Sequence, residues 1–278
     1  RVNTLPELCA DGTDRNRTSP FAFTGNKFEF RMCGSQQNLS DPNIILNTAV
    51  AEQCDRFCSY VETHGDLEFM AAALQFVRHT FRDHQRILFD GNGYSQAWEQ
   101  EAEGRGLLNN KTTPDALPCM VDPKNIAFLE RYGVLTETET RARYVAQAEQ
   151  YAKLINIEAN TMVYMVRHMY LPALFDYSGD IATSVATKAE IGIESRAERE
   201  VVTTLTGGIN EIYSAVAALD EDNRHAQSIE DCREQDDYYR DSVIPKMVTL
   251  RAAVDAMEMI CGTDYWPVPS YNKMLFYV

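Results

Sequence analysis

Three long segments with helical patterning lie in the second half of the chain, and they constrain its fold more than any other feature. They run over residues 136–171, 194–219 and 229–261. A proline inside a helix removes a backbone donor and clashes with the preceding turn, so we expect Pro172 to end the first helix and Pro245 to kink the third. Segments of this length bury their apolar sides by packing side by side, as in a helical bundle.

The end of the third segment carries apolar residues at spacings of 3, 4, 3 and 4, which fall on one face of a helix: Met247, Leu250, Val254, Met257 and Cys261. This repeat is typical of a helix that packs against an antiparallel neighbour. The stretch 220–241 is rich in Asp and Glu, which predicts either a solvated face or a helical connection. The Met and Tyr residues within 151–170 predict helix packing.

Residues 1–34 carry the clear pattern of β-structure. Phe21–Phe23 and Lys27–Met32 alternate apolar with small or polar residues, as half-buried strands do. Gly25 and Asn26 between them tolerate the backbone of a tight turn. We therefore expect a β-hairpin here, followed by helices near 43–62, 66–89 and 97–103.

The sequence changes character near residue 109, where a loop-like stretch with three prolines begins. We therefore predict two domains, over residues 1–108 and 109–278. The predicted fold class is α+β, predominantly α, with a β-hairpin in the first domain and a helical extension in the second.

The formal net charge of −15 comes from 26 Lys and Arg against 41 Asp and Glu. A field of this sign repels nucleic acid and anionic membranes, so we expect neither as a partner. The seven cysteines are odd in number and irregularly spaced, which predicts buried free thiols and argues against a secreted disulfide framework. With no signal peptide and no long apolar run, the expected localisation is cytoplasmic.

The strongest candidate site is the segment Lys27-Phe-Glu-Phe-Arg31. On a strand, Lys27, Glu29 and Arg31 would share one face in steps of about 7 Å. Arg17 could reach the same place through the hairpin. The pattern fits a site for anions and a metal, but it also fits a ladder of salt bridges on the solvent-exposed face of a hairpin. Spacing alone favours the ladder.

Several blocks of the chain resemble type III glutamine synthetases. The most specific is ADGTDRNRTSPFAFTGNKFEFR at residues 10–31, which resembles the catalytic domain of that family. Further matching blocks are FDGNGYS at 89–95, KTTPDALP at 111–118, INIEAN at 155–160 and YWPVPSY at 265–271. The resemblance covers essentially the whole chain, and it makes residues 1–108 the C-terminal part of the catalytic domain.

The resemblance implies a ligase of glutamine biosynthesis, which joins ammonia to L-glutamate with ATP through a γ-glutamyl phosphate. It implies Glu29 as a ligand of Mg²⁺ or Mn²⁺ and Arg31 as a substrate-binding residue. It implies Arg17 as a catalytic, nucleotide-binding residue near the transferring phosphoryl group, and Lys27 as a contact of the nucleotide phosphate. An arginine of the wider superfamily falls on Ala22 here, which leaves part of the phosphate-binding site without a residue.

The other metal ligands of the family have no counterpart in this chain, so we expect the isolated chain to be inactive. The resemblance also implies a homo-oligomer of stacked rings, similar to a dodecamer. Two alternatives stay open. The chain could be a non-catalytic helical module for subunit assembly, or part of a γ-glutamyl-amine ligase of the same fold.

Overall fold

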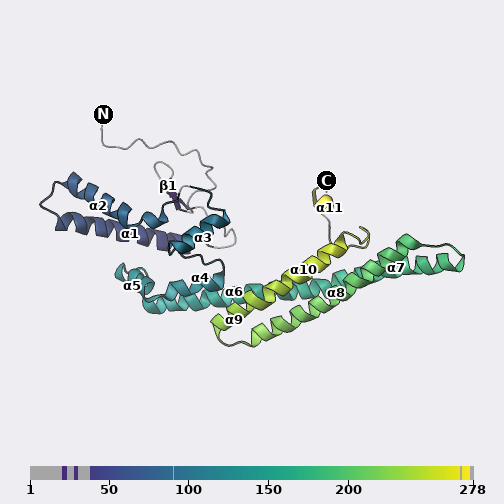
Figure 1. The fold of residues 1–278 in the computed structure, drawn as a ribbon. Coiled ribbons are helices and arrows are strands. Elements are labelled where there is room, and N and C mark those ends of the chain that lie inside the picture. Colours follow the sequence, from purple (N-terminus) through teal and green to yellow (C-terminus); the bar gives the residue numbers. More distant parts are fainter. Residues whose placement is uncertain (1–20, 24–27, 31–37, 90, 270, 276–278) are drawn as a thin grey trace. The chain divides into compact units, whose positions relative to one another are not determined.

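The computed structural model describes residues 21–23, 28–30, 38–89, 91–269 and 271–275 (Figure 1). The chain divides into two compact units. Unit 1 comprises residues 1–111 and 126–136, and unit 2 comprises residues 112–125 and 137–278. The division into domains at residue 108 stays a prediction, since the units are defined by contacts and exchange a short segment.

Unit 1 contains β1 (Phe21–Phe23), β2 (Phe28–Phe30), α1 (Ser40–Thr63), α2 (Phe69–Asp83), η2 (Gln85–Ile87), α3 (Gln96–Gly104) and most of α5 (Pro123–Arg131). The helices α1, α2 and α3 lie where the sequence predicts helices. An aromatic cluster joins α1 to α2: the ring of Phe76 meets Phe57 at 5.3 Å and Tyr60 at 5.5 Å between centroids, in edge-to-face geometry. Such pairs add to the free energy of apolar burial.

The predicted α+β fold class is wrong, because the described chain is mainly helical. Its β-structure amounts to β1 and β2, which have three residues each and pair antiparallel with one another. A pair this short forms no sheet layer, so the β-hairpin of a catalytic α+β domain is not what the structure contains. The alternation of apolar residues predicts extended backbone locally. A fold class depends on how many strands pair, and local alternation does not encode that number.

Unit 2 contains α4 (Thr113–Ala116), η3 (Leu117–Val121), α6 (Glu137–Met165), η4 (Val166–Tyr170), α7 (Leu171–Glu190), α8 (Arg196–Ser228), α9 (Cys232–Tyr238), η5 (Tyr239–Val243), α10 (Ile244–Glu258) and α11 (Tyr271–Leu275). The helix α8 is central, since α6, α7 and α10 all pack on it. Figure 1 shows α8 running beside α6 and α10 along much of its length.

Pairs of contacts give the directions of α6 and α10 relative to α8. Asn160 contacts Asn223, whereas Arg167, further along the chain, contacts Asp220, so α6 and η4 run antiparallel to α8. Lys246 near the start of α10 pairs with Asp222, and Met257 near its end lies over Gly208, so α10 is also antiparallel to α8. It follows that α6 and α10 are parallel to one another and flank the same helix.

The prediction that Pro172 ends the first long helix is wrong. The chain continues from α6 through η4, a π-helical turn at Val166–Tyr170, into α7 without leaving the helix. A second π-helical turn, η5, comes before Pro245 in the same way. A π turn widens the helix by one residue and so accommodates the missing donor and the ring of the proline that follows.

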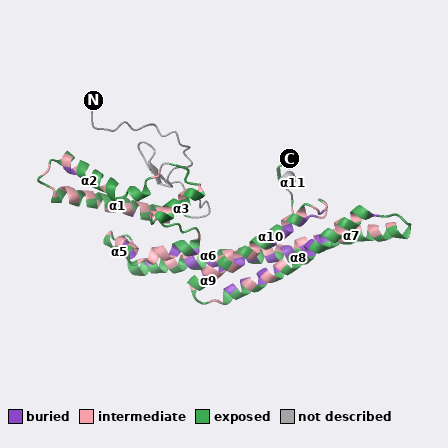
Figure 2. Cartoon of the chain, in the orientation of Figure 1, coloured by how far each residue is buried: buried purple, intermediate pink, exposed green. Residues whose placement is uncertain are grey.

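The apolar core lies in unit 2, where the buried residues of α6, α8 and α10 face one another (Figure 2). The predicted apolar repeat on the last long helix is confirmed there. Leu250, Val254, Met257 and Cys261 are all buried, and Met247 packs against them from the edge. In α1 and α2 of unit 1, by contrast, the buried residues are Thr48 and Ala72.

Candidate functional site

The residues that the sequence singled out lie mostly outside the described part of the chain. Arg17, Lys27 and Arg31 fall there, and the backbone of Glu29 lies on β2 opposite Ala22. The convergence of these four side chains on one face therefore stays a prediction. The described part of the chain shows a different concave surface, in unit 2.

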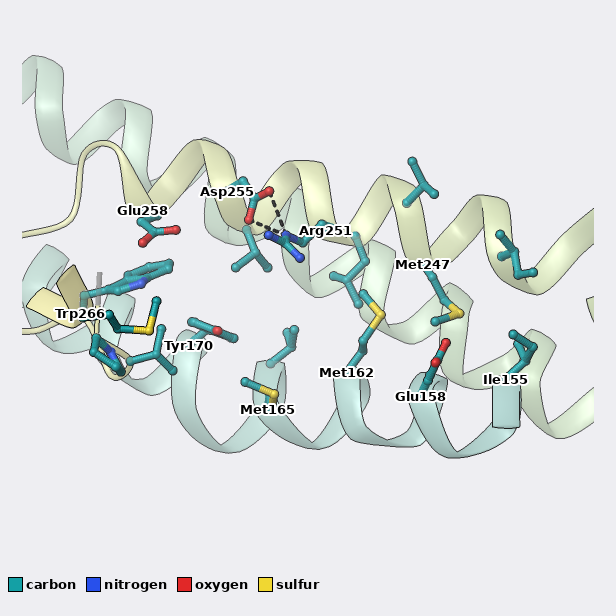
Figure 3. A pocket seen from close by; sticks show the side chains of 18 residues that line it. Ile155, Glu158, Met162, Met165, Tyr170, Met247, Arg251, Asp255, Glu258 and Trp266 are labelled. Carbon is teal, nitrogen blue, oxygen red and sulfur yellow. Dashed lines mark hydrogen bonds and ion pairs between the residues drawn. The ribbon is translucent and has the colours of Figure 1, made fainter. Parts of the chain in front are cut away.

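This surface is a groove between the parallel helices α6 and α10, with α8 behind them (Figure 3). It exists because α6 and α10 both pack on α8 but make few contacts with one another. On the α6 side it runs from Ile155 to Tyr170, a length of about 22 Å at 1.5 Å per residue. Its volume is about 610 Å³.

The walls of the groove are mainly apolar and rich in methionine. Figure 3 shows Met162 and Met165 from α6 and Met247 from α10 directed into the space between the two helices. The last of the groove methionines, Met274, belongs to α11. Methionine side chains are flexible and polarizable, so a surface built from them adapts to the shape of what it contacts.

Carboxylates lie along the groove. Glu158 lies near the end marked by Ile155, and Glu258 lies at the opposite end beside Trp266 (Figure 3). Between them, Nε of Arg251 donates to both carboxylate oxygens of Asp255, at 2.7 and 2.8 Å. Within the described chain, neither glutamate forms a salt bridge. The groove therefore carries a net negative charge.

Asp236 of α9 is a carboxylic acid in the interior of unit 2, with 3% of its surface exposed. Burial, with a smaller contribution from the charge of Asp237, raises the pKa of this carboxyl to about 7. Its Oδ1 has no hydrogen-bond partner among the described residues. Burial and the charge of Asp236 in turn raise the pKa of Tyr151 to about 12.

A second polar cluster joins α6 to α8 on the family-like block at 155–160. Nδ2 of the buried Asn223 donates to Oδ1 of Asn156 at 3.0 Å and to Oδ1 of Asn160 at 3.1 Å. One turn before, Asp220 accepts from Arg167 at 2.7 Å and also pairs with Arg224. Of the two alternatives predicted for 220–241, the solvated face is wrong for Asp220, Asn223 and Asp236, which are buried.

In the part of the chain that the structure describes, no group of three or more His, Cys, Asp or Glu residues is placed to hold a metal ion. No described helix is both long and apolar enough to cross a membrane. The cysteines that can be assessed are free, as predicted, but Cys54 and Cys58 on α1 are exposed and not buried. Their spacing of four places both cysteines on one face of the helix, but it does not show whether another part of the protein packs on that face.

The sequence does not reveal the groove, because it predicts helix packing for Met162, Met165 and Tyr170. The apolar repeat identifies which face of α6 is apolar, but it does not identify which part of that face another helix covers. The sequence does contain one indication of a binding surface: Glu158 and Glu258 lie next to apolar residues of α6 and α10, as in an amphipathic surface that binds another protein.

Residues 72–189 match the model of the glutamine synthetase C-terminal domain. The chain is also similar to three proteins named as glutamine synthetases. It is 36% identical over 280 residues to the type-3 glutamine synthetase of Dictyostelium discoideum, across 98% of this chain and 38% of that protein. It is 34% identical to the glutamine synthetase of Butyrivibrio fibrisolvens, across 96% of this chain and 38% of that protein.

The third relative, the glutamine synthetase of Bacteroides fragilis, is 30% identical across 99% of this chain and 39% of its own length. The chain thus spans well under half the length of the curated relatives it matches. Along nearly its whole length the chain is similar to proteins named glutamine synthetase, one of them a type-3 glutamine synthetase, and residues 72–189 match the C-terminal domain model.

Proposed function

We propose that this chain is the C-terminal part of a type-3 glutamine synthetase, whose reaction is the ATP-dependent ligation of ammonia to L-glutamate. The observation that carries the proposal is the similarity along 96–99% of the chain to proteins named glutamine synthetase. The match to the C-terminal domain model supports the placement in the C-terminal part.

In this proposal Glu29 is a ligand of Mg²⁺ or Mn²⁺, because both ions prefer hard oxygen donors. Arg31 binds a carboxylate of glutamate, since a guanidinium can hold a carboxylate through two parallel hydrogen bonds. Arg17 and Lys27 neutralise charge on the nucleotide and on the transferring phosphoryl group. When bound, the metal would offset the negative charge of the phosphates.

The described residues do not complete such a metal site, because they contain no cluster of three or more potential ligands. One carboxylate cannot hold the ion in a catalytic geometry, so the other ligands must come from elsewhere. We therefore expect the isolated 278-residue chain to form no glutamine. Glutamine formed by the purified chain from glutamate, ammonia and ATP would contradict this.

A chimera tests the role of Glu29. The part of the Bacteroides fragilis relative that this chain does not span is joined to this chain, and glutamine formation and oligomer size are measured. Glu29→Ala is expected to lower activity by at least about 100-fold with the oligomer intact, as for loss of a charge-stabilising group. Glu221→Ala, an exposed carboxylate on α8, is the matched control and is expected to leave activity within a factor of two. Dispersal of the oligomer by Glu29→Ala would assign that residue a structural role.

We also propose that the chain works in a homo-oligomer. One face of α2 supports this: Met70, Leu74, Val77 and Phe81 recur at spacings of 4, 3 and 4, and all are exposed. An apolar stripe of this kind usually marks a surface that other protein covers.

A further inference from the structure

We propose that the groove between α6 and α10 is a docking site for an amphipathic, basic helix of a partner protein. The first argument is the architecture of unit 2. The helices α6 and α10 lie in parallel on α8 and make few contacts with one another, so the three helices form an open arrangement. A fourth helix laid between α6 and α10 would complete a four-helix bundle.

The shape of the groove is the second argument. The groove has a volume of about 610 Å³ and runs for about 22 Å along the α6 side. An elongated apolar groove of this kind can hold the row of side chains from one face of a helix. The groove length matches about 15 helical residues, or four turns.

The chemistry of the walls is the third argument. Methionines from both helices can adjust to the side chains of an incoming helix, and grooves of this composition are typical of helix-in-groove recognition. Tyr170 and Trp266 at one end add aromatic surface. These walls therefore select an apolar row at helical spacing without requiring one particular sequence.

Charge decides which kind of helix fits. Glu158 and Glu258 stand at opposite ends of the groove, and Asp255 neutralises the guanidinium of Arg251 between them. Acidic partners are further disfavoured by the net charge of −15. Lysine or arginine residues flanking the apolar row of a partner helix would pair with the two glutamates and set its position along the groove.

A pair of synthetic helical peptides of about 15 residues tests the proposal. Both carry leucines on one face; one carries lysines and the other glutamates on the opposite face. With a fluorescent label and the full 278-residue chain, the lysine peptide is expected to bind at least about tenfold more tightly than its twin. Equal binding of the two peptides would overturn the proposal.

Charge variants of the chain distinguish binding of the lysine peptide in the groove from its non-specific attraction to the net negative charge of the chain. The double variant Glu158→Lys/Glu258→Lys is expected to weaken binding of the lysine peptide at least about tenfold. The double variant Glu211→Lys/Glu221→Lys changes the net charge equally at exposed positions of α8 outside the groove, and is expected to leave affinity within a factor of three. If both variants weaken binding alike, attraction is non-specific and the groove is not the site.

Methionine methyl NMR locates the peptide directly. Binding in the groove is expected to shift the methyl signals of Met162, Met165 and Met247, and to leave those of Met70 and Met259, which are exposed elsewhere, unchanged. Shifts confined to Met70 would place the peptide on unit 1 and overturn the proposal. A concentration-dependent dimer of the free chain that already shifts the groove methyls would identify a second copy as the occupant, which also overturns it.

Discussion

At the scale of single residues, Asp236 gives the protein a pH-dependent stability. Its pKa is about 7 in the folded chain against an ordinary value of 3.8. Between these values the folded chain holds a proton that the unfolded chain has released. The free energy of unfolding therefore falls as the pH rises from about 4 to 7, by about 4 kcal/mol in all, and changes no further through this group above that range.

Replacement of Asp236 by Asn tests this effect. The amide has the shape of the neutral carboxyl but cannot ionise, so the variant is expected to have a higher melting temperature than the native chain at pH 8. The difference is expected to shrink or reverse at pH 5, where the native carboxyl is protonated. Asp264→Asn removes an exposed carboxylate and serves as the control. The same dependence of melting temperature on pH in the native chain and in Asp236→Asn would refute the assignment.

Asn223 is the second residue with a predicted effect on stability. Its side chain is 1% exposed and donates to two asparagines of α6. Asn223→Ala removes the donor to Oδ1 of Asn160 and opens a gap between α6 and α8, while Oδ1 of Asn156 still accepts from Gln227 and Asn160. The substitution is expected to cost about 1–3 kcal/mol in chemical denaturation. Gln227→Ala removes the exposed donor to Asn156 and is expected to cost less than about 0.5 kcal/mol. An equal loss of unfolding free energy in the two variants would contradict the prediction that the buried hydrogen bonds of Asn223 stabilise the chain more than the exposed one of Gln227.

At the scale of elements, the neighbouring glycines of α8 have opposite environments. A Cβ on Gly207 would meet no atom within 4 Å, whereas a Cβ on Gly208 would lie 2.2 Å from Sδ of Met257 on α10. Gly207→Ala is expected to stabilise the chain by about 0.5–1 kcal/mol, because alanine has the higher helix propensity. Gly208→Ala is expected to lower stability, since Met257 must move out of its place in the core. Melting temperatures of the two variants check both signs.

The exposed stripe of α2 predicts how unit 1 behaves in the isolated chain. Leu74→Ser and Phe81→Ser remove side chains that are 53% and 60% exposed, so each is expected to change stability by less than about 0.5 kcal/mol and to reduce self-association in light scattering. Phe76→Ser, on the face that meets Phe57, is the contrasting variant and is expected to destabilise the α1–α2 pair. Unchanged self-association in both stripe variants would show that another surface is responsible.

The helices were predictable from the sequence to different degrees. The start of α3 follows from a capping residue, because the side chain of Ser95 accepts from the backbone of Trp98. The helix α1 begins at Ser40, before the expected start near residue 43, and no side chain caps it. The passage of the chain through Pro172 was not predictable, because it depends on a π turn that packing against α8 supports. Local propensity sets where a helix can begin, and tertiary contacts decide whether it continues past a proline.

At the scale of the whole molecule, the two units are expected to differ in stability. The apolar core cluster draws all its buried residues from 152–266, within unit 2. In hydrogen exchange, amides of α1 and α2 are therefore expected to exchange faster than those of α8 and α10, because local opening is easier where little apolar surface is buried. Equal protection in all four helices would contradict this.

The proposed catalytic residues were predicted from family resemblance and not from the folding pattern of the chain. The roles proposed for Glu29 and Arg31 rest on resemblance to a family, since the spacing of charges on a strand by itself favours a surface ladder of salt bridges. The groove differs from these residues, because only the structure identifies it. The sequence shows its methionines but does not show that they line an open surface.

The sequence by itself determined the helical character of residues 136–261, the apolar face of α10 and the similarity to proteins named glutamine synthetase. These follow from residue patterns that repeat along the chain or match known blocks. Only the tertiary structure decided that Asp236 and Asn223 are buried and that α6 and α10 leave a groove between them. Burial depends on which helix covers which face, and that is set by contacts between residues far apart in the sequence.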